Sequence, residues 1–522
     1  MTEITIKKDR IVCDFPYDQE KKDILKLYLG ASWNKRTKTW SVKNNYVNRQ
    51  ALDGIFPNWR TPEQNNRQFF EIPSYLMSHQ KKALKTAYKW PRWGFFYDCG
   101  TGKTLIGIEI HKMIGGKTLV VCLRSLIENA WIEDIKRFAP KLRYLNAHKM
   151  RKRKRFEEYI EPAEIVIINY ESFKNDIKIY ERFSWDTLLI DESSKLKSHT
   201  TKTTKQVSEF SYNVPNCYLF SGTPAPNHPM EYYNQMRVLN PFLFDCSQYR
   251  FRNKFFIPLD RQGFKYELNP ELKDDFYKKI SSVSEVVRKS DVLDLPEKTF
   301  VFRDVELSKK EAKAYHEMIQ QLVVYVENSE VSTANQLTKI MKLRQITSGS
   351  IIDSKNDVIH KLGNSKANAL IDILEEIGNN QIVIWVQFHF EVFEISNIIK
   401  KTIKEKPAIC TGKQSATQQD NAISQFKSGQ ARILIAHPGT IAHGQTLVNC
   451  HNAIYYSLSY SYEQLTQSID RFHRKGQTHP CTYYILNATI SKQKTIDKII
   501  WDVLQCKGNI ENEVFSYIQN TA

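Results

Sequence analysis

The segment DCGTGKT, residues 98–104, follows an apolar run and precedes a stretch with helical periodicity. A glycine-containing loop between a strand and a helix lets backbone N–H groups surround a phosphate, and the helix N-terminus adds its dipole. The residues expected to contact a nucleotide there are Gly100, Thr101, Gly102, Lys103 and Thr104. Lys103 would reach the β and γ phosphates, and the Thr104 hydroxyl would hold Mg²⁺. The strict pattern has a glycine at position 97, where this chain has Tyr97.

A second segment, LLIDES at 188–193, ends an apolar run in two acids. Asp191 is placed to hold Mg²⁺, and Glu192 is placed to orient and polarise an attacking water. An ordinary acidic loop after a strand is the alternative. We favour the catalytic interpretation because the spacing from the glycine-containing loop suits an adjacent strand in the same sheet.

The third segment, QSIDRFHRKGQ at 467–477, has Arg471 and Arg474 three residues apart. On a helix, this spacing places both side chains on one face. Arginine keeps its charge, and its planar guanidinium matches phosphate oxygens. The pair therefore predicts arginine fingers that close on a nucleotide held by another domain. A solvated basic helix end is the alternative, and the two upstream segments make it the weaker one.

Two series of short apolar runs, rich in branched and aromatic residues, must position these segments. The first series is GFFYDCG (94–100), TLVVCL (118–123), EIVIINY (164–170), TLLIDE (187–192) and CYLFSGT (217–223). The second is QIVIWVQF (381–388), ARILIAHP (431–438), NAIYYSLS (452–459) and CTYYILN (481–487). Continuous apolar runs of this length predict strands buried on both faces, in parallel sheets covered by helices. The fold class is therefore α/β, with two parallel-sheet lobes.

Changes in composition divide the chain further. Between the two series the sequence becomes charged and helical, with no clear strand series, whereas the N-terminus combines alternating strands, an amphipathic helix and clustered tryptophans. We expect a small α+β domain at 1–60, a linker at 61–70, lobe one at 71–243, a helical insertion at 244–362 and lobe two at 363–522.

The charge of the chain favours a polyanionic partner, because 75 Lys and Arg against 57 Asp and Glu give +18. The nine cysteines form no CxxC pair, which argues against a zinc module and for a reducing compartment. We see neither a signal peptide nor an apolar run long enough to span a bilayer, and expect a soluble intracellular protein. The basic run KMRKRKR (149–155) is an import signal, a DNA-facing patch or, as we favour, the start of a surface helix.

The order of the motifs resembles that of superfamily 2 nucleic-acid motors, and specifically of the Snf2 family. The order is GxGKT, DExx, SGTP at 221–224, then QxxDRxHRxGQ. The segments RKSDVLDLPEK (288–298), LRQITSG (343–349), GNSKANAL (363–370) and TIDKIIWDVLQCK (495–507) also resemble this family. The similarity covers about residues 70–510 and implies two RecA-like lobes, ATP and Mg²⁺ as cofactors, and movement along DNA.

The resemblance also implies roles for individual residues at the nucleotide. HQKKAL (79–84) is similar to the adenine-recognising segment, which puts Gln80 on the base. In lobe two, Gln467, Arg471 and Arg474 would face the γ-phosphate. HPGTIAHGQTL (437–447) occupies the place of the lobe-two coupling motif, where Gly444 fits the pattern. Three residues of this segment differ from the usual family motif: Ile441, Gln445 and Thr446. In lobe one, Ser194 differs from the family at the fourth position of DExx.

The resemblance also implies that four residues of lobe one contact the DNA backbone. VVCLRSLIENAW (120–131) supplies Arg124 and Ser125, and INYESF (168–173) supplies Asn169 and Tyr170.

The N-terminal piece, residues 14–42, resembles the HARP domain of annealing helicases, a Snf2 branch. The matching residues are Phe15, Pro16, Tyr17, Asp18, Gly30, Trp33, Lys38 and Trp40. We expect a strand, a helix and then a hairpin that carries the aromatic residues. Trp33 and Trp40 either stack on bases or form the core of a very small domain, and we expect Trp40 to be mostly core. The basic turn with Lys35, Arg36 and Lys38 is the better candidate for DNA contact.

These inferences predict an ATP-dependent translocase on duplex or forked DNA that anneals strands or remodels forks. We expect a monomer with no membrane or zinc site, in the cytoplasm of a bacterium or of a phage host, or in the nucleus if the source is eukaryotic. A strand-separating helicase on DNA or RNA is the alternative, although we find no wedge element. A non-catalytic scaffold is disfavoured because Lys103, Glu192, Arg471 and Arg474 are all present.

Overall fold

A computed structural model describes most of the chain, and its contacts form two compact units, residues 1–292 with 510–522 and residues 293–509. The described residues are 2–29, 31–56, 70–150, 156–244, 247–260, 265–327, 333–353, 358–441 and 445–521. Gly30, Gly444, residues 61–69 of the predicted linker and residues 151–155 of the basic run lie outside these ranges. No helix in the described ranges has both the length and the apolar character needed to cross a membrane.

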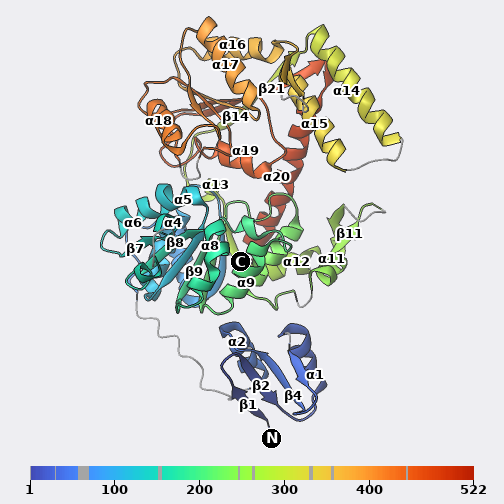
Figure 1. The fold of residues 1–522 in the computed structure, drawn as a ribbon. Helices are drawn as coiled ribbons and strands as arrows, with labels where there is room; N and C mark the ends of the chain where they lie inside the picture. The colour runs from blue at the N-terminus through green and yellow to red at the C-terminus, as the bar shows by residue number, and fades with distance from the viewer. Residues whose placement is uncertain are drawn as a thin grey trace. The chain divides into compact units, whose positions relative to one another are not determined.

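The N-terminal domain is a four-stranded antiparallel sheet with two short helices (Figure 1). Its elements are β1 (Glu3–Ile6), β2 (Arg10–Asp14), α1 (Gln19–Asp23), the π-helix η1 (Ile24–Tyr28), β3 (Ser32–Asn34), β4 (Thr39–Lys43) and α2 (Tyr46–Ile55). The strand order is β1-β2-β4-β3, and Ile11, Val42 and Leu52 are among its buried core residues. The hairpin β3–β4 carries the paired tryptophans, as the sequence predicts.

Lobe one is built on a seven-stranded sheet whose described pairings are all parallel. Its order is β13 (Ser284–Val287), β5 (Arg92–Tyr97), β10 (Asn216–Phe220), β9 (Thr187–Asp191), β6 (Thr118–Cys122), β8 (Ile165–Asn169) and β7 (Tyr144–Asn146). The five apolar runs of the first series form the central strands β5, β6, β8, β9 and β10. The edge strand β13 comes from the segment 244–362, so our expectation of an insertion without strands was wrong there.

Helices cover both faces of this sheet, and each face has its own apolar core. One face packs against α3 (Ser78–Lys89), α4 (Lys103–Ile114) and α6 (Glu133–Phe138). The other packs against α8 (Tyr170–Tyr180), α9 (Lys202–Ser211), α10 (Tyr232–Leu239) and α12 (Lys273–Ser281). The first unit also contains α7 (Ala147–Met150), α11 (Gln248–Phe255), α13 (Lys289–Val292) and the hairpin β11 (Phe256–Pro258) with β12 (Tyr266–Leu268). The two-sided burial explains why the strands are continuous apolar runs.

Lobe two has a second parallel sheet. Its order is β14 (Lys298–Glu306), β21 (Cys481–Ile490), β20 (Asn452–Tyr455), β17 (Ile382–Trp385), β19 (Ile433–Ala436) and β18 (Ala408–Cys410), and β22 (Gln493–Lys494) pairs antiparallel with β21. β14 also lies in the segment 244–362 and is another strand that we missed. The two parallel lobes and the small N-terminal sheet confirm the predicted fold class.

The helices of lobe two also form two cores. One core contains side chains of α16 (Ser365–Ile377) and α17 (His389–Thr402). The other contains side chains of α14 (Lys309–Glu327), α15 (Thr333–Thr347), α18 (Ala416–Lys427), α19 (Tyr462–Ile469) and α20 (Ile496–Thr521). A short antiparallel pair, β15 (Ser350–Asp353) and β16 (Val358–Lys361), follows α15. The insertion is therefore partly helical, as expected, and contributes α14 and α15 to the lobe-two core.

Candidate functional site

The loop between β5 and α4 has the geometry of a phosphate-binding loop. Gly100 has φ +89° and Gly102 has φ +83°, a conformation that disfavours residues with a Cβ. A Cβ on Gly102 would also lie 2.3 Å from Nε2 of Gln80. Lys103 is the first residue of α4. Its ammonium group donates hydrogen bonds to the carbonyls of Tyr97 at 2.7 Å and Asp98 at 3.2 Å. The predicted residues are thus together at the N-terminus of a helix, a position that favours an anion such as phosphate.

Tyr97 is accommodated because it is the last residue of β5 and its side chain is buried in the lobe, with 0% exposed. Its hydroxyl donates to the Glu285 carboxylate, which also accepts from the Thr86 hydroxyl at 3.2 Å. Burial and the Glu285 charge raise the pKa of Tyr97 well above its usual range. Glu285 belongs to the missed strand β13, and no motif in the sequence connects it with this loop.

Gln80 lies against the loop, as its predicted role requires. Its amide donates to the Thr101 carbonyl at 3.1 Å, and its oxygen accepts from the Met77 N–H at 3.0 Å. A ring nitrogen of His79 lies 2.9 Å from the same Thr101 carbonyl. Contact between Gln80 and adenine stays a prediction, whereas His79 is an additional residue at the loop.

The two acids lie at the carboxyl end of β9, in the same sheet as β5 as expected, but β10 lies between the two strands, so our expectation of an adjacent strand was wrong. Asp191 and Glu192 are 4% and 5% exposed, and Glu192 adopts φ +54°. Asp191 Oδ1 accepts from the Glu192 N–H and Oδ2 from the Trp131 indole, both at 3.0 Å. The Tyr170 hydroxyl donates to the Asp191 carbonyl at 2.8 Å. Trp131 therefore holds the Asp191 carboxylate, and Tyr170 holds the backbone of the acid segment.

The electrostatic interaction between Lys103 and the two acids indicates that the loop and the acids belong to one site. Burial lowers the pKa of Lys103, but Cys99, Glu192, Asp191 and Asp98 raise it, and the pKa lies above its usual value. Burial raises the pKa of Asp191, while Lys103, the Trp131 indole and the Glu192 N–H oppose the rise. The lysine and the acids thus stabilise one another's charged forms within one water-poor pocket.

The same residues suit Mg²⁺, which prefers carboxylate and hydroxyl oxygens. Each Asp191 oxygen accepts one of the hydrogen bonds above, and a carboxylate oxygen has a further lone pair for a metal. Thr104 lies in the first turn of α4, at the phosphate loop. Asp191 and Thr104 therefore remain the predicted Mg²⁺ ligands.

A hydrogen-bonded chain connects the acids to the SGTP motif. The Ser193 hydroxyl donates to Gln235 Oε1 at 2.7 Å, and Gln235 Nε2 donates to the Pro224 carbonyl at 2.6 Å. Gln235 is fully buried in α10. The chain thus uses the third residue of DESS, while Ser194, the residue that departs from the family, is also buried. Gln235 carries no recognisable motif, and only its position in space reveals it.

The two lobe-two arginines follow α19 and are not on a helix. α19 ends at Ile469, and Arg471 and Arg474 lie in turns, so our helical placement was wrong. Arg471 is 7% exposed and donates to the Gln445 carbonyl at 3.3 Å, while the Leu447 N–H donates to the Arg471 carbonyl at 2.8 Å. Arg471 is therefore attached to the coupling segment 437–447.

The remaining lobe-two candidate, Gln467, lies within α19 and is 7% exposed. Its amide donates to the Glu463 carboxylate at 3.3 Å. Arg474 is half-buried. The roles of Gln467, Arg471 and Arg474 at the γ-phosphate stay predictions.

The residues predicted to contact DNA differ in accessibility. Arg124 is exposed at the start of α5 (Arg124–Leu126), and Ser125 is half-buried beside it. Asn169 and Tyr170 are 9% and 8% exposed, and the Tyr170 hydroxyl is occupied by the acid segment. The structure thus places the Tyr170 side chain inside lobe one, where it supports the acids.

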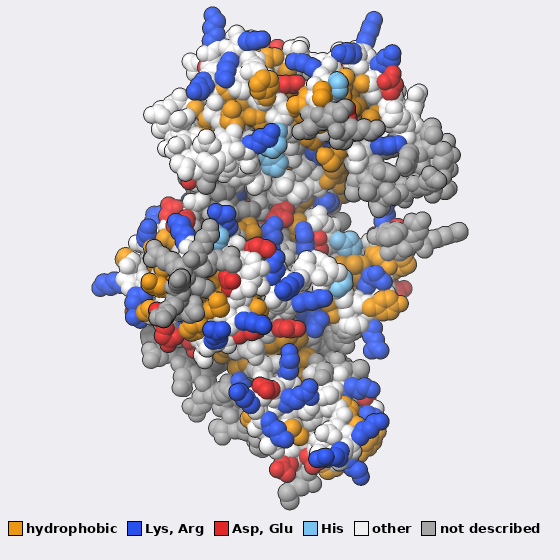
Figure 2. Space-filling model, in the orientation of Figure 1, with side chains coloured by type: hydrophobic (Ala, Val, Ile, Leu, Met, Phe, Trp, Pro, Cys, Tyr) orange, Lys and Arg blue, Asp and Glu red, His pale blue; other side chains and the backbone are white. Residues whose placement is uncertain are grey.

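The N-terminal basic turn is accessible. Lys35, Arg36 and Lys38 are exposed, and Lys38 adopts φ +53°. Trp33 is 45% exposed and contacts Trp40, with ring centroids 5.1 Å apart, whereas Trp40 is partly buried against the domain core. Figure 2 shows Lys and Arg side chains spread over this domain with few acidic ones among them.

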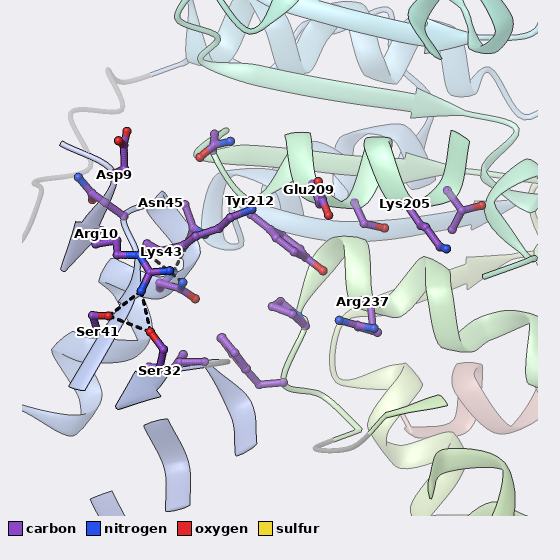
Figure 3. Close-up of a pocket in the computed structure, with 18 of the residues that line it drawn as sticks. Asp9, Arg10, Ser32, Ser41, Lys43, Asn45, Lys205, Glu209, Tyr212 and Arg237 are labelled. Atoms are coloured by element: carbon purple, nitrogen blue, oxygen red, sulfur yellow. Dashed lines mark hydrogen bonds between the residues drawn. The ribbon is translucent and has the colours of Figure 1, made fainter. Parts of the chain in front are cut away.

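A separate pocket of about 860 Å³ is lined by the N-terminal domain and by α9 and α10, within the first unit (Figure 3). The Val47 N–H donates to the Tyr212 carbonyl at 3.2 Å beside it. The lining cations are Lys8, Arg10, Lys43, Lys205 and Arg237, and the lining acids are Asp9 and Glu209. Arg10 donates to the hydroxyls of Ser32 at 2.6 Å and Ser41 at 2.8 Å. The pocket is basic and shares no residue with the nucleotide site.

The chain is similar to several known proteins. The chain is 22% identical over 363 residues to the protein p41 of Acyrthosiphon pisum secondary endosymbiont phage 1, covering 67% of this chain and 76% of p41. It is 23% identical over 427 residues to YwqA of Bacillus subtilis (strain 168), named as an ATP-dependent helicase/translocase, covering 77% of this chain and 45% of YwqA. The chain therefore spans less than half of YwqA.

Among solved structures, the SWI2/SNF2 ATPase core of Sulfolobus solfataricus in complex with double-stranded DNA has 24% sequence identity and a TM-score of 0.41. This comparison covers 87% of our chain and 96% of the archaeal one. The model of the SNF2-related domain matches residues 31–350, and the model of the helicase conserved C-terminal domain matches residues 365–476. The chain therefore belongs to the Snf2 family, as an SNF2-related ATPase with a helicase C-terminal domain.

Proposed function

We propose that this ATPase translocates on double-stranded DNA and uses the movement to anneal strands or remodel forks. The observation that carries the proposal is the assembled lobe-one site, in which Lys103, Asp191 and Glu192 meet at the carboxyl ends of β5 and β9, the two strands on either side of β10. Two buried carboxylates beside a half-buried lysine are costly to keep unless they have a role, and hydrolysis supplies one.

In the proposed reaction, Lys103 leaves its carbonyl partners and binds the β and γ phosphates. Glu192 orients the attacking water and accepts its proton, and Asp191 and Thr104 would hold the metal. When bound, Mg²⁺ would neutralise part of the negative charge on the phosphates. Arg471 and Arg474 stabilise the charge that develops on the γ-phosphoryl group, an effect worth roughly 10³ to 10⁵ in rate in related chemistry.

Closure of lobe two over the nucleotide is the proposed step that DNA promotes. Arginine fingers and the phosphate loop belong to different lobes, so hydrolysis would require both lobes to act together. DNA bound to the Arg124–Ser125 segment and to lobe two would favour that state, and repeated cycles would move the protein along the duplex.

The N-terminal domain is the proposed fork-directing element. Support comes from the exposed basic turn next to Trp33, because cations and an accessible aromatic ring suit phosphates and unstacked bases. The basic pocket beside α9 would add phosphate contacts from the same domain.

Deletion of residues 1–60 tests this division of labour. We expect the truncated protein to keep most of its DNA-stimulated ATP hydrolysis and to lose strand annealing or fork regression. A finer test replaces Lys35 and Arg36 with glutamine, and the matched control replaces Lys21 and Lys22 on α1. The first pair should impair annealing much more than the second, and equal effects would leave the domain with no specific DNA-binding role.

A further inference from the structure

The indole of Trp131 contacts the acid predicted to hold the metal. Its N–H donates to Asp191 Oδ2 at 3.0 Å, and the two residues are 60 positions apart in the sequence. Trp131 is 0% exposed and Asp191 is 4% exposed. Because Oδ1 accepts from the Glu192 N–H, the indole and this N–H together fix the plane of the carboxylate. A hydrogen bond to a carboxylate in a water-poor site is among the stronger ones in proteins.

An unusual local structure brings the indole to this place. Trp131 lies in η2 (Ile127–Ile132), a π-helical turn between α5 and α6. Such turns insert an extra residue into a helix and are frequent at functional sites. On the other side of the ring, a Cβ on Gly107 of α4 would lie 2.6 Å from the indole Cη2. Trp131 therefore fills the space between the helix that begins at Lys103 and the strand that ends at Asp191.

The same short segment begins with the exposed residue of the predicted DNA-backbone motif. Arg124 and Ser125 start α5, and η2 follows without a loop. A displacement of these residues by a bound phosphate would pass along the helical turns to Trp131. The next group in that direction is the Asp191 carboxylate.

We propose that Trp131 is a positioning residue that orients Asp191 for Mg²⁺–nucleotide binding and couples this orientation to DNA at Arg124 and Ser125. The coupling rests on the proposed function, whereas the orientation of Asp191 does not. Trp131 acts through Asp191 and contacts no phosphate itself.

The decisive variant is Trp131→Phe, which keeps an aromatic ring and removes the donor. The readout is equilibrium binding of a fluorescent ATP analogue to the full-length protein during an Mg²⁺ titration without DNA. We expect the Mg²⁺ concentration for half-maximal binding to rise about tenfold, because a hydrogen bond to a charged group is lost. The ratio of duplex-stimulated to unstimulated ATP hydrolysis should also fall.

Trp185→Phe is the matched control. Trp185 is a 6% exposed tryptophan of lobe one, and its indole donates to the Tyr180 carbonyl at 2.8 Å, on the opposite face of the sheet from Trp131. It should leave both readouts unchanged. Wild-type Mg²⁺ dependence in Trp131→Phe, or equal shifts in both variants, would overturn the proposal.

A double-variant cycle separates positioning from a loss of packing. In an Asp191→Asn background, Trp131→Phe should add little to the Mg²⁺ requirement, since the two residues act in series. Fully additive effects would mean that the indole only fills space. If duplex DNA fails to stimulate the wild-type protein, the proposed function fails, while the Mg²⁺ titration still decides whether Trp131 orients Asp191.

Discussion

The carboxylate of Asp98, in the phosphate loop, accepts a 2.9 Å hydrogen bond from the backbone N–H of Lys289, 191 residues later in the chain. The Asp98 N–H in turn donates to the Val287 carbonyl at 3.0 Å. Further along the same segment, the Pro296 carbonyl lies 2.8 Å from a ring nitrogen of His473, within the arginine segment of lobe two. The segment 287–296, here called the connecting segment, is therefore attached at its two ends to two different motifs of the ATPase.

Replacement of Asp98 with alanine should weaken nucleotide binding. The loop would lose the acceptor that joins it to the connecting segment, and a hydrogen bond to a charged group is worth about 1.5–3 kcal/mol. We expect the KM for ATP to rise roughly tenfold or more. Asp98→Asn keeps an acceptor oxygen and should lie closer to wild type. Steady-state hydrolysis checks both, and identical KM values for alanine and wild type would contradict the role.

Gln235→Met should uncouple the acids from the SGTP motif. Methionine fills a similar volume but makes neither of the hydrogen bonds to Ser193 and Pro224, each worth about 1 kcal/mol. The DNA-stimulated rate should fall about tenfold, and more than the rate without DNA. Asn234→Ala is the neighbouring control, because Asn234 donates to the Lys197 carbonyl at 3.0 Å instead. An equal loss in both variants would point to general disruption of α10.

The fold was largely predictable because the signal was local. Apolar runs bounded by polar turns identified the central strands of both sheets, since two-sided burial demands such runs. The edge strands β13 and β14 escaped because Ser284–Val287 is short and Lys298–Glu306 carries charges on its exposed face.

The positions of the candidate catalytic residues were predictable for the same reason, whereas the residues that support them were not. Lys103, Asp191 and Glu192 stand in motifs that a strand and its following turn place without outside help. Trp131 and Gln235 act through contacts between residues far apart in sequence. The arginine pair failed as a helix because α19 is capped at Asp470, before Arg471.

His111 should make lobe one sensitive to acid. Burial lowers its pKa to about 4, and its ring lies 2.8 Å from the Thr118 hydroxyl. The unfolded chain binds a proton near pH 6.5 and the folded one does not, so stability is complete above that pH and falls as pH drops toward 4. From pH 7 to 5 this group alone costs about 2 kcal/mol.

Urea unfolding at pH 7 and pH 5 tests this assignment. His111→Gln removes the titrating group and should lose less stability than wild type over this interval, even if it begins less stable. The same loss in both proteins would show that other groups carry the acid sensitivity.

The ion pair of Lys366 with Asp497 should be critical in lobe two. Its atoms are 2.6 Å apart, and the side chains are 1% and 9% exposed. Asp497 also accepts a hydrogen bond from the Thr347 hydroxyl at 3.1 Å. These contacts join three segments that resemble the Snf2 family, 343–349, 363–370 and 495–507. Lys366→Met would leave a buried charge without its partner, and should cost about 3–5 kcal/mol.

The matched comparison is Glu317→Gln. It breaks the pair of Lys313 with Glu317, whose side chains are 80% and 58% exposed, and should change stability little. Thermal unfolding of both variants measures how much stability each substitution removes. A small effect of Lys366→Met would mean that Asp497 is sufficiently satisfied by its other donors.

The most direct test of the account is ATP hydrolysis with duplex DNA, forked DNA, single-stranded DNA and RNA, for wild type and Lys103→Ala. We predict that duplex or forked DNA stimulates the wild-type rate and that the variant hydrolyses no ATP with any of them. Stimulation by RNA alone, or by single strands but not by duplex or forked DNA, would contradict the assignment of this chain as a duplex-DNA translocase.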